Sequence, residues 1–114
     1  MPAPNLLEAH WLVIFNRAVA GELVTIQSGV DKYAPVFTSS SLAATFLRDL
    51  NDPRLEVSRL ETWVLKDTFL TAAGLIGATR VMFDYQAGQH DAVSAPLEGL
   101  RGFVLERLGS SSIH

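Results

Sequence analysis

The stretch PVFTSSSLAATFLRDL, residues Pro35–Leu50, decides the fold that the sequence predicts. It begins as a short β-strand, reaches a run of hydroxyl residues and continues as an amphipathic helix. Leu42, Phe46 and Leu50 recur at helical spacing. The sequence Asn51-Asp52-Pro53 ends this helix, because proline disfavours helical geometry in the residue before it. A strand that leads directly into a helix indicates a chain that mixes both kinds of element.

Residue pattern predicts further strands and helices on both sides of this stretch. Segments rich in β-branched and aromatic residues, or with alternating polarity, are expected to form strands; these are His10–Asn16, Leu23–Ser28, Leu55–Val57 and Thr79–Tyr85. Apolar residues at helical spacing predict helices over about 60–75 and from Pro96 to Gly109. We therefore predict one α+β domain over residues 1–109 and a disordered tail at 110–114. Its sheet is mostly antiparallel with four or five strands, and two or three helices pack on one face.

The N-terminal region allows two interpretations. The composition of His10–Asn16 favours a strand. In the separate strand that contains Pro35, the proline suggests an edge position or a strand start. Yet the apolar residues between Leu6 and Ala18 also follow helical spacing, and Pro4 fits the first turn of a helix. Strand and helix therefore both remain open for residues 5–19.

The helix expected over residues 60–75 is unusually apolar. Ser58 and Glu61 form a capping-box pattern at its start. One stripe of the helix consists of Leu65, Phe69, Ala72 and Ile76, and this stripe is widened by Trp63, Val64 and Leu70. Such a broad apolar surface predicts burial on more than one side.

Composition favours association with another chain. Hydrophobic residues make up 48% of the sequence and charged residues 18%, whereas charged residues average about 25% in soluble domains. A small domain this apolar is expected to keep some apolar surface for a partner. The large aromatic residues considered are Trp11, Phe15, Trp63, Phe69 and Phe103. Most of them are expected in the core and a few at a subunit interface. We therefore predict a homo-oligomer or a protein partner.

Several classes of function are disfavoured. The net charge is −3 and the nine basic residues are scattered, so no nucleic-acid partner is expected. The chain has no cysteine, and His10, His90 and His114 lack metal-ligand spacing, so neither a metal nor another cofactor is predicted. The N-terminus lacks the positive region of a signal peptide, and its longest apolar run is too short to span a bilayer. We predict a cytoplasmic protein without a membrane partner.

The hydroxyl run at the start of the predicted helix is one candidate site. Thr38, Ser39, Ser40 and Ser41 stand where unpaired backbone N–H groups and the helix dipole attract anions. One of these serines also suits the N-cap position, which is the simpler interpretation. The run lacks the glycines and the lysine of a phosphate-binding loop.

The segment between Asp84 and Ser94 is the second candidate. It carries Tyr85, His90 and Asp91. His90 titrates near neutrality, and a neighbouring carboxylate would raise its pKa. However, nucleophile and base are recognised by geometry, not by proximity in the sequence, and no nucleophile-elbow pattern occurs here. No catalytic residue is therefore assigned.

A family resemblance covers roughly residues 11–88. The motif VFTS at Val36–Ser39, which ends a strand before a helix, and the later strand ending near Asp84–Gly88 resemble the N-terminal domain of the bacterial SseB family. The resemblance implies an α+β domain used for association or regulation in the bacterial cytoplasm. It supplies no catalytic residues.

Two functions from different classes remain open. The first is a non-enzymatic binding or assembly module that forms a homodimer, because apolar content is high and no catalytic motif occurs. The alternative is a small enzyme or anion-binding protein. Its site would lie between the helix start at 38–41 and the segment 84–94, which requires the two to meet in space.

Overall fold

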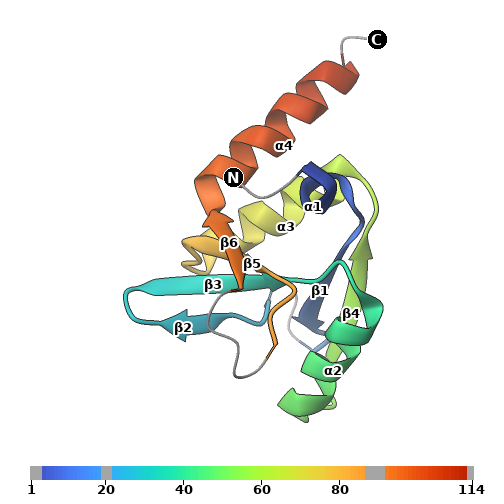
Figure 1. Cartoon of the computed structure of the whole chain (residues 1–114), viewed down its shortest axis with the longest axis vertical. Coiled ribbons are helices and arrows are strands. Elements are labelled where there is room, and N and C mark those ends of the chain that lie inside the picture. The colour runs from blue at the N-terminus through green and yellow to red at the C-terminus, as the bar shows by residue number, and fades with distance from the viewer. Residues whose placement is uncertain (1–3, 19–21, 87–91, 113–114) are drawn as a thin grey trace.

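The computed structural model describes residues 4–18, 22–86 and 92–112, and side chains from 5 to 109 within these ranges. Figure 1 shows the arrangement of the elements. In chain order they are α1 (Pro4–Glu8), β1 (Trp11–Asn16), β2 (Ile26–Ser28), β3 (Asp31–Val36), α2 (Ser40–Leu50), β4 (Leu55–Leu60), α3 (Trp63–Leu75), β5 (Arg80–Phe83), β6 (Val93–Pro96) and α4 (Leu97–Ser112). The α+β class is confirmed.

The strands form two sheets, so the prediction of one mostly antiparallel sheet is wrong. β1 and β4 pair antiparallel as a two-stranded ribbon, and the second sheet has the order β2-β3-β5-β6. Within it β3 and β5 are parallel. The chain from β3 to β5 passes through α2, β4 and α3, and a connection of this length allows parallel pairing. A bridge between Leu12 and Phe37 links the ribbon to the end of β3.

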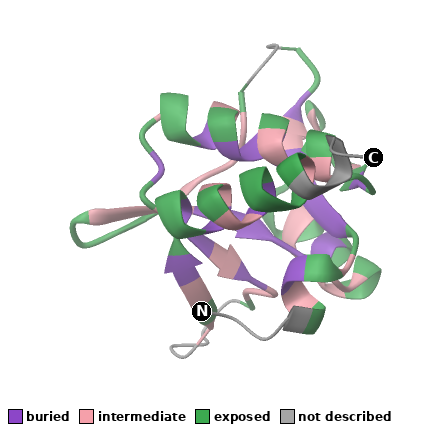
Figure 2. Cartoon of the chain, turned by 90° about the horizontal axis from the view of Figure 1, so that it is seen from above, coloured by how far each residue is buried: buried purple, intermediate pink, exposed green. Residues whose placement is uncertain are grey.

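Helices cover both faces of the ribbon, which corrects the expectation that they share one face. Successive residues of β1 point to opposite sides. Trp11 and Val13 belong to a core cluster built with α1, α3, α4 and the larger sheet, whereas Leu12 and Ile14 belong to a second cluster built with α2. Figure 2 shows the exposed residues on the outer sides of the helices and the buried ones between helices and strands.

The N-terminal ambiguity resolves into both elements in succession. The strand predicted at His10–Asn16 is confirmed as β1, and the helix is limited to α1. Trp11 joins the two, because its indole Nε1 donates a hydrogen bond to the carbonyl of Leu6 at 3.0 Å. The strand expected at Leu23–Ser28 is regular only over β2, although Leu23 forms a bridge with Phe15.

Other boundaries also differ from the sequence-based expectations. Ser58 lies inside β4, and Thr62 is the N-cap of α3, so the capping box at Ser58 is wrong. Pro35 lies inside β3 and not at a strand start. It is tolerated because β2 pairs only with Asp31–Tyr33, which leaves Pro35 paired with Met82 of β5 alone. α4 runs past Gly109 to Ser112, where we expected a tail. No helix in the described ranges is long and apolar enough to cross a membrane.

Candidate functional site

The hydroxyl run does meet the segment that begins at Asp84. The backbone N–H of Thr38 donates to Oδ1 of Asp84 at 2.7 Å, and its Oγ1 donates to Oδ2 at 2.6 Å. Asp84 adopts a left-handed conformation with φ of 53°. The protein's own carboxylate therefore occupies the donors that Thr38 could offer to an external anion.

Two of the three serines are engaged with each other or with the helix. Ser39 is the N-cap of α2, and its Oγ accepts a hydrogen bond from the N–H of Leu42 at 3.4 Å. The same Oγ lies 2.9 Å from Oγ of Ser41. Ser40, the first residue of α2, is exposed. The run therefore caps the helix and leaves Ser40 facing solvent.

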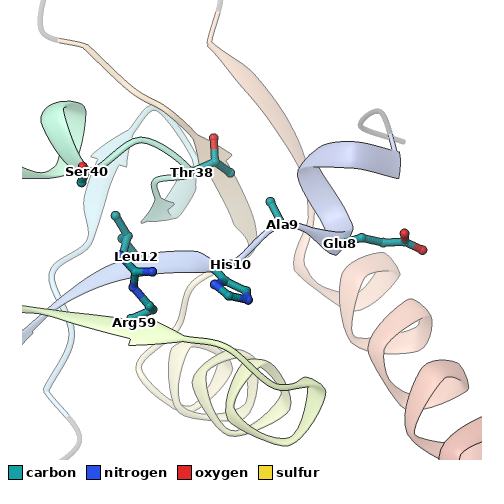
Figure 3. Close-up of a pocket in the computed structure, with 7 residues that line it drawn as sticks. All are labelled: Glu8, Ala9, His10, Leu12, Thr38, Ser40 and Arg59. Carbon is teal, nitrogen blue, oxygen red and sulfur yellow. The ribbon is translucent and has the colours of Figure 1, made fainter.

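Ser40 borders a depression that also contains basic side chains. The depression measures about 460 Å³ and is lined by Glu8, Ala9, His10, Leu12, Thr38, Ser40 and Arg59. Figure 3 shows Arg59 and His10 side by side below Thr38, while the side chain of Glu8 extends away from them. The carboxylate of Glu8 accepts a hydrogen bond from Arg107 of α4 at 2.7 Å. Arg59 and His10 are thus the basic groups nearest the start of α2 in this depression.

The second predicted segment is described only in part. His90 and Asp91 lie outside the described residues. Tyr85 packs edge-on against Phe46 at 6.0 Å, and Oγ of Ser94 accepts hydrogen bonds from the guanidinium of Arg80 at 3.3 and 3.2 Å. Within the described ranges no group of three potential ligands is placed to hold a metal ion. The described groups therefore serve packing and strand pairing.

One side of α3 is uncovered. Its buried residues, Lys66, Phe69, Leu70 and Ala73, face the core. The opposite side consists of Val64, Thr68, Thr71 and Leu75, and we call these four residues the outer face of α3. The side chains of Val64 and Leu75 are 60% and 84% exposed. The expected burial on more than one side is thus absent within the single chain, although the apolar pattern that suggested it is present.

An apolar groove adjoins the outer face. It measures about 240 Å³ and lies between the β1–β4 ribbon and α3. Its lining residues are Val13, Phe15, Glu22, Leu23, Ser58, Leu60, Leu65, Thr68, Phe69 and Ala72. Leu65 is 43% exposed at its margin. Apolar surface therefore continues from the outer face toward the ribbon.

Lys66 is a buried cation that the sequence analysis missed. It is 2% exposed, and its Nζ donates to the carbonyls of Leu7 at 2.9 Å and Ala9 at 2.7 Å. The same Nζ lies 4.3 Å from the ring centre of Trp63 and 4.8 Å from that of Trp11. Burial lowers its pKa from 10.5 to about 8, and the charge of Glu8 opposes this shift. Its spacing of three residues from Trp63 places it on the buried side of α3, which was a usable signal.

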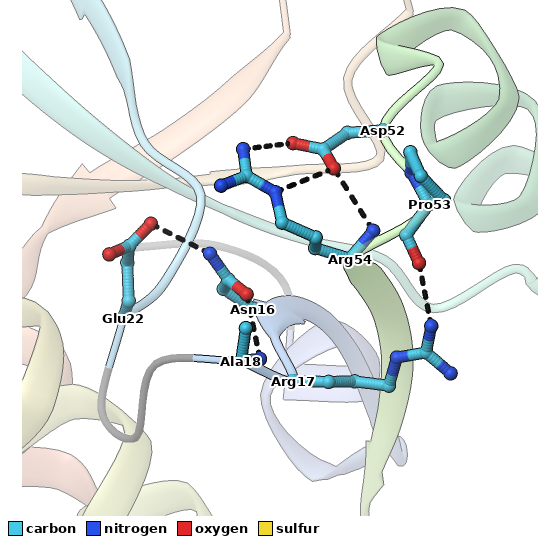
Figure 4. Close-up of polar contacts among 7 residues, drawn as sticks. All are labelled: Asn16, Arg17, Ala18, Glu22, Asp52, Pro53 and Arg54. Atoms are coloured by element: carbon cyan, nitrogen blue, oxygen red, sulfur yellow. Dashed lines mark hydrogen bonds and ion pairs between the residues drawn. The ribbon is translucent and has the colours of Figure 1, made fainter.

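A polar cluster lies at the end of the β1–β4 ribbon where β1 ends and β4 begins (Figure 4). Asp52 accepts hydrogen bonds from the side chain and backbone N–H of Arg54, which lower its pKa from 3.8 to about 2. Arg17 donates to the carbonyl of Pro53 at 2.7 Å. The buried amide of Asn16 donates to Glu22 at 3.0 Å. Asp52 and Arg54 thus form an ion pair in the turn after α2, and Arg17 ties the end of β1 to the same turn.

The geometry defines a small α+β protein with an uncovered and uncharged helix face and a separate depression that contains basic side chains. The comparison with family models assigns it a family. Residues 8–100 match the family described as "Protein of unknown function (DUF3234)". The chain belongs to the DUF3234 family. No curated protein matches the sequence. The resemblance to the SseB family stays a prediction.

Proposed function

We propose that this chain is a non-enzymatic assembly module that forms a homodimer through the outer face of α3. One observation carries the proposal: the outer face of α3 is exposed to solvent and contains no charged side chain. Soluble helices normally place charged and polar residues on the side opposite the core, and a helix that is apolar all round is normally buried. The two charged residues of α3 are Lys66, which is buried, and Asp67, which is half-buried.

Exposed large side chains could stabilise a dimer if a partner covered them. Burying apolar surface contributes roughly 25 cal/mol per Å². Leu75 and Val64 are mostly exposed in the single chain, and Leu65 adds to the same region. A partner that covers these residues and the adjoining groove therefore gains the energy that the single chain leaves unused. The proposed setting is the bacterial cytoplasm, supported by the SseB resemblance and compatible with the lack of cysteine.

Light scattering on a dilution series tests the proposal. The wild-type chain is expected to be dimeric at high concentration and to dissociate on dilution. Val64→Glu places a charge on the outer face and is expected to shift the protein to a monomer. Val30→Glu is the matched control, because Val30 is 95% exposed and lies outside α3. A wild-type chain that stays monomeric at the highest soluble concentration contradicts the proposal.

A second candidate function is anion binding in the depression beside Ser40. The observation that favours it is the presence of Arg59 and His10 in the same depression as the start of α2. Among the described residues Arg59 forms no ion pair. Titration with inorganic phosphate, followed by the backbone amide resonances of Ser40 and Ser41, tests it. Saturable shifts that disappear in Arg59→Ala support a site, and shifts that persist in that variant contradict it.

A further inference from the structure

We propose that the hollow between α2 and the residues after β5 binds a small organic ammonium ion with an apolar body. The hollow measures about 440 Å³, and its lining includes Leu42, Phe46, Asp49, Leu50, Tyr85 and Gln86. Small-molecule sites have volumes of this order and are mostly apolar, with a few polar groups that orient the ligand. The hollow is separate from the outer face of α3, so the proposal does not depend on homodimerisation.

One wall of the hollow is a single side of α2. Leu42, Phe46 and Asp49 are three or four residues apart, so their side chains lie in a row along the helix surface. The Cβ atoms of such neighbours are about 5–6 Å apart. A cation held by the carboxylate of Asp49 therefore lies within reach of the ring of Phe46.

The opposite wall is held in place by Asp84. Its backbone has φ of 53°, a conformation that is uncommon for a residue other than glycine. Both oxygens of its carboxylate accept hydrogen bonds from Thr38, which ties the end of β5 to the start of α2. Tyr85 comes next in the chain, and its ring packs edge-on against that of Phe46 with the centroids 6.0 Å apart. Both walls are thus positioned before a ligand binds, which lowers the entropic cost of binding.

The charge of the hollow selects a cation. Asp49 is exposed and forms no ion pair with any residue that the structure describes. A second hollow of about 290 Å³ shares Leu42 and Gln86 with the first and contains Asp84. Among the described residues, no lysine or arginine lines either hollow. Two carboxylates therefore flank the site, and a ligand of opposite charge is complementary to them.

The aromatic rings give a second reason for a cation. The face of an aromatic ring attracts an ammonium group within about 6 Å of the ring centre. Phe46 and Tyr85 are both half-buried, so part of each ring is accessible from the hollow. The rings and the carboxylate of Asp49 suit an ammonium head, while Leu42 and Leu50 suit an apolar body. A neutral or anionic molecule of the same shape gains only the apolar contacts.

Probes of similar shape and different charge test the proposal: phenethylammonium, 2-phenylethanol and 3-phenylpropionate. Binding is followed by the backbone amide resonances of Phe46, Asp49 and Gln86. Phenethylammonium is expected to give saturable shifts, with an affinity about tenfold higher than that of 2-phenylethanol. The anion 3-phenylpropionate is expected to bind more weakly than the alcohol. Added salt is expected to weaken the binding of phenethylammonium and not that of the alcohol.

Asp49→Asn removes the charge and keeps the size of the side chain. It is expected to lower the affinity for phenethylammonium to that for 2-phenylethanol. Glu106→Gln is the matched control, because it makes the same change in net charge at an exposed position of α4 outside the hollow. This control is expected to leave the affinity unchanged.

Several results would overturn the proposal. Equal affinities for phenethylammonium and 2-phenylethanol show that the hollow does not select a cation. An affinity for phenethylammonium that is unchanged in Asp49→Asn, or lowered equally in Glu106→Gln, shows that the carboxylate of Asp49 is not its partner. The absence of saturable shifts at Phe46 and Gln86, up to the solubility limit of the probe, shows that the hollow does not bind it.

Discussion

Replacement of Lys66 by methionine tests whether the buried ammonium costs or contributes stability. Methionine keeps an unbranched chain of similar length and removes the charge. At neutral pH two effects oppose each other: the variant avoids burying a cation, but the carbonyls of Leu7 and Ala9 lose their donor. A buried acceptor left unpaired costs about 1–3 kcal/mol. The free energy of unfolding at a single pH therefore does not separate the two effects. Its dependence on pH does.

The magnitude follows from the shift of the pKa. Burial lowers the pKa of Lys66 from 10.5 to about 8. Between these values the unfolded chain binds more protons at this site than the folded chain, so the free energy of unfolding rises with pH. One pKa unit corresponds to about 1.4 kcal/mol, which gives a total of about 3 kcal/mol. This is an upper bound, because the carbonyls and the rings of Trp63 and Trp11 favour the charged form.

The assay is urea unfolding followed by circular dichroism from pH 7 to 10.5. We expect the free energy of unfolding of the wild type, minus that of Lys66→Met, to increase by about 2–3 kcal/mol over this range. Other groups titrate in the same range, and the difference between the two proteins removes their contribution. Lys66→Arg keeps a cation that does not titrate here. The free energy of unfolding of Lys66→Arg, minus that of Lys66→Met, is therefore expected to show no such rise. A difference that stays constant or falls with pH refutes the reasoning.

Three substitutions test other parts of the structure by the same unfolding measurement. Thr62→Ala removes the N-cap of α3 and is expected to cost about 1 kcal/mol, whereas Ser58→Ala costs less; the reverse order contradicts the observed start of α3. Asp84→Asn keeps the left-handed backbone but weakens both bonds to Thr38, with an expected loss of about 1–2 kcal/mol; unchanged stability argues against that contact. Leu100→Ala empties a fully buried position and is expected to cost about 2–5 kcal/mol, so a loss below 1 kcal/mol indicates a different core.

The part of the fold that could be predicted from sequence is the part with local signals. α2 begins after a serine cap and ends before proline, and the structure has it at Ser40–Leu50 as expected. β1 and β5 were found because their composition is typical of strands. β6 was missed because its sequence, Val-Ser-Ala-Pro, contains only one residue type that is typical of strands. The parallel pairing of β3 with β5 joins segments far apart in the chain, and local patterns carry no information on it.

For the candidate sites, too, local features could be predicted from the sequence and long-range contacts could not. The sequence located the hydroxyl run at a helix start, because caps are local features. It did not show that Asp84 supplies the carboxylate for Thr38, since this contact spans 46 residues. The breadth of the apolar pattern on α3 was visible in the sequence. Which side of that helix faces the core depends on packing with β1, α1 and α4, so the outer face could not be assigned before the structure.

Sedimentation equilibrium of the wild-type chain is the most direct test of the central claim, that the outer face of α3 joins two copies. The account predicts a mass that approaches twice 12.4 kDa as concentration rises. It also predicts that Val64→Glu holds the mass at that of one chain, while Val30→Glu behaves as the wild type. A wild-type mass of one chain at every concentration, or a Val64→Glu dimer as stable as the wild type, contradicts the claim.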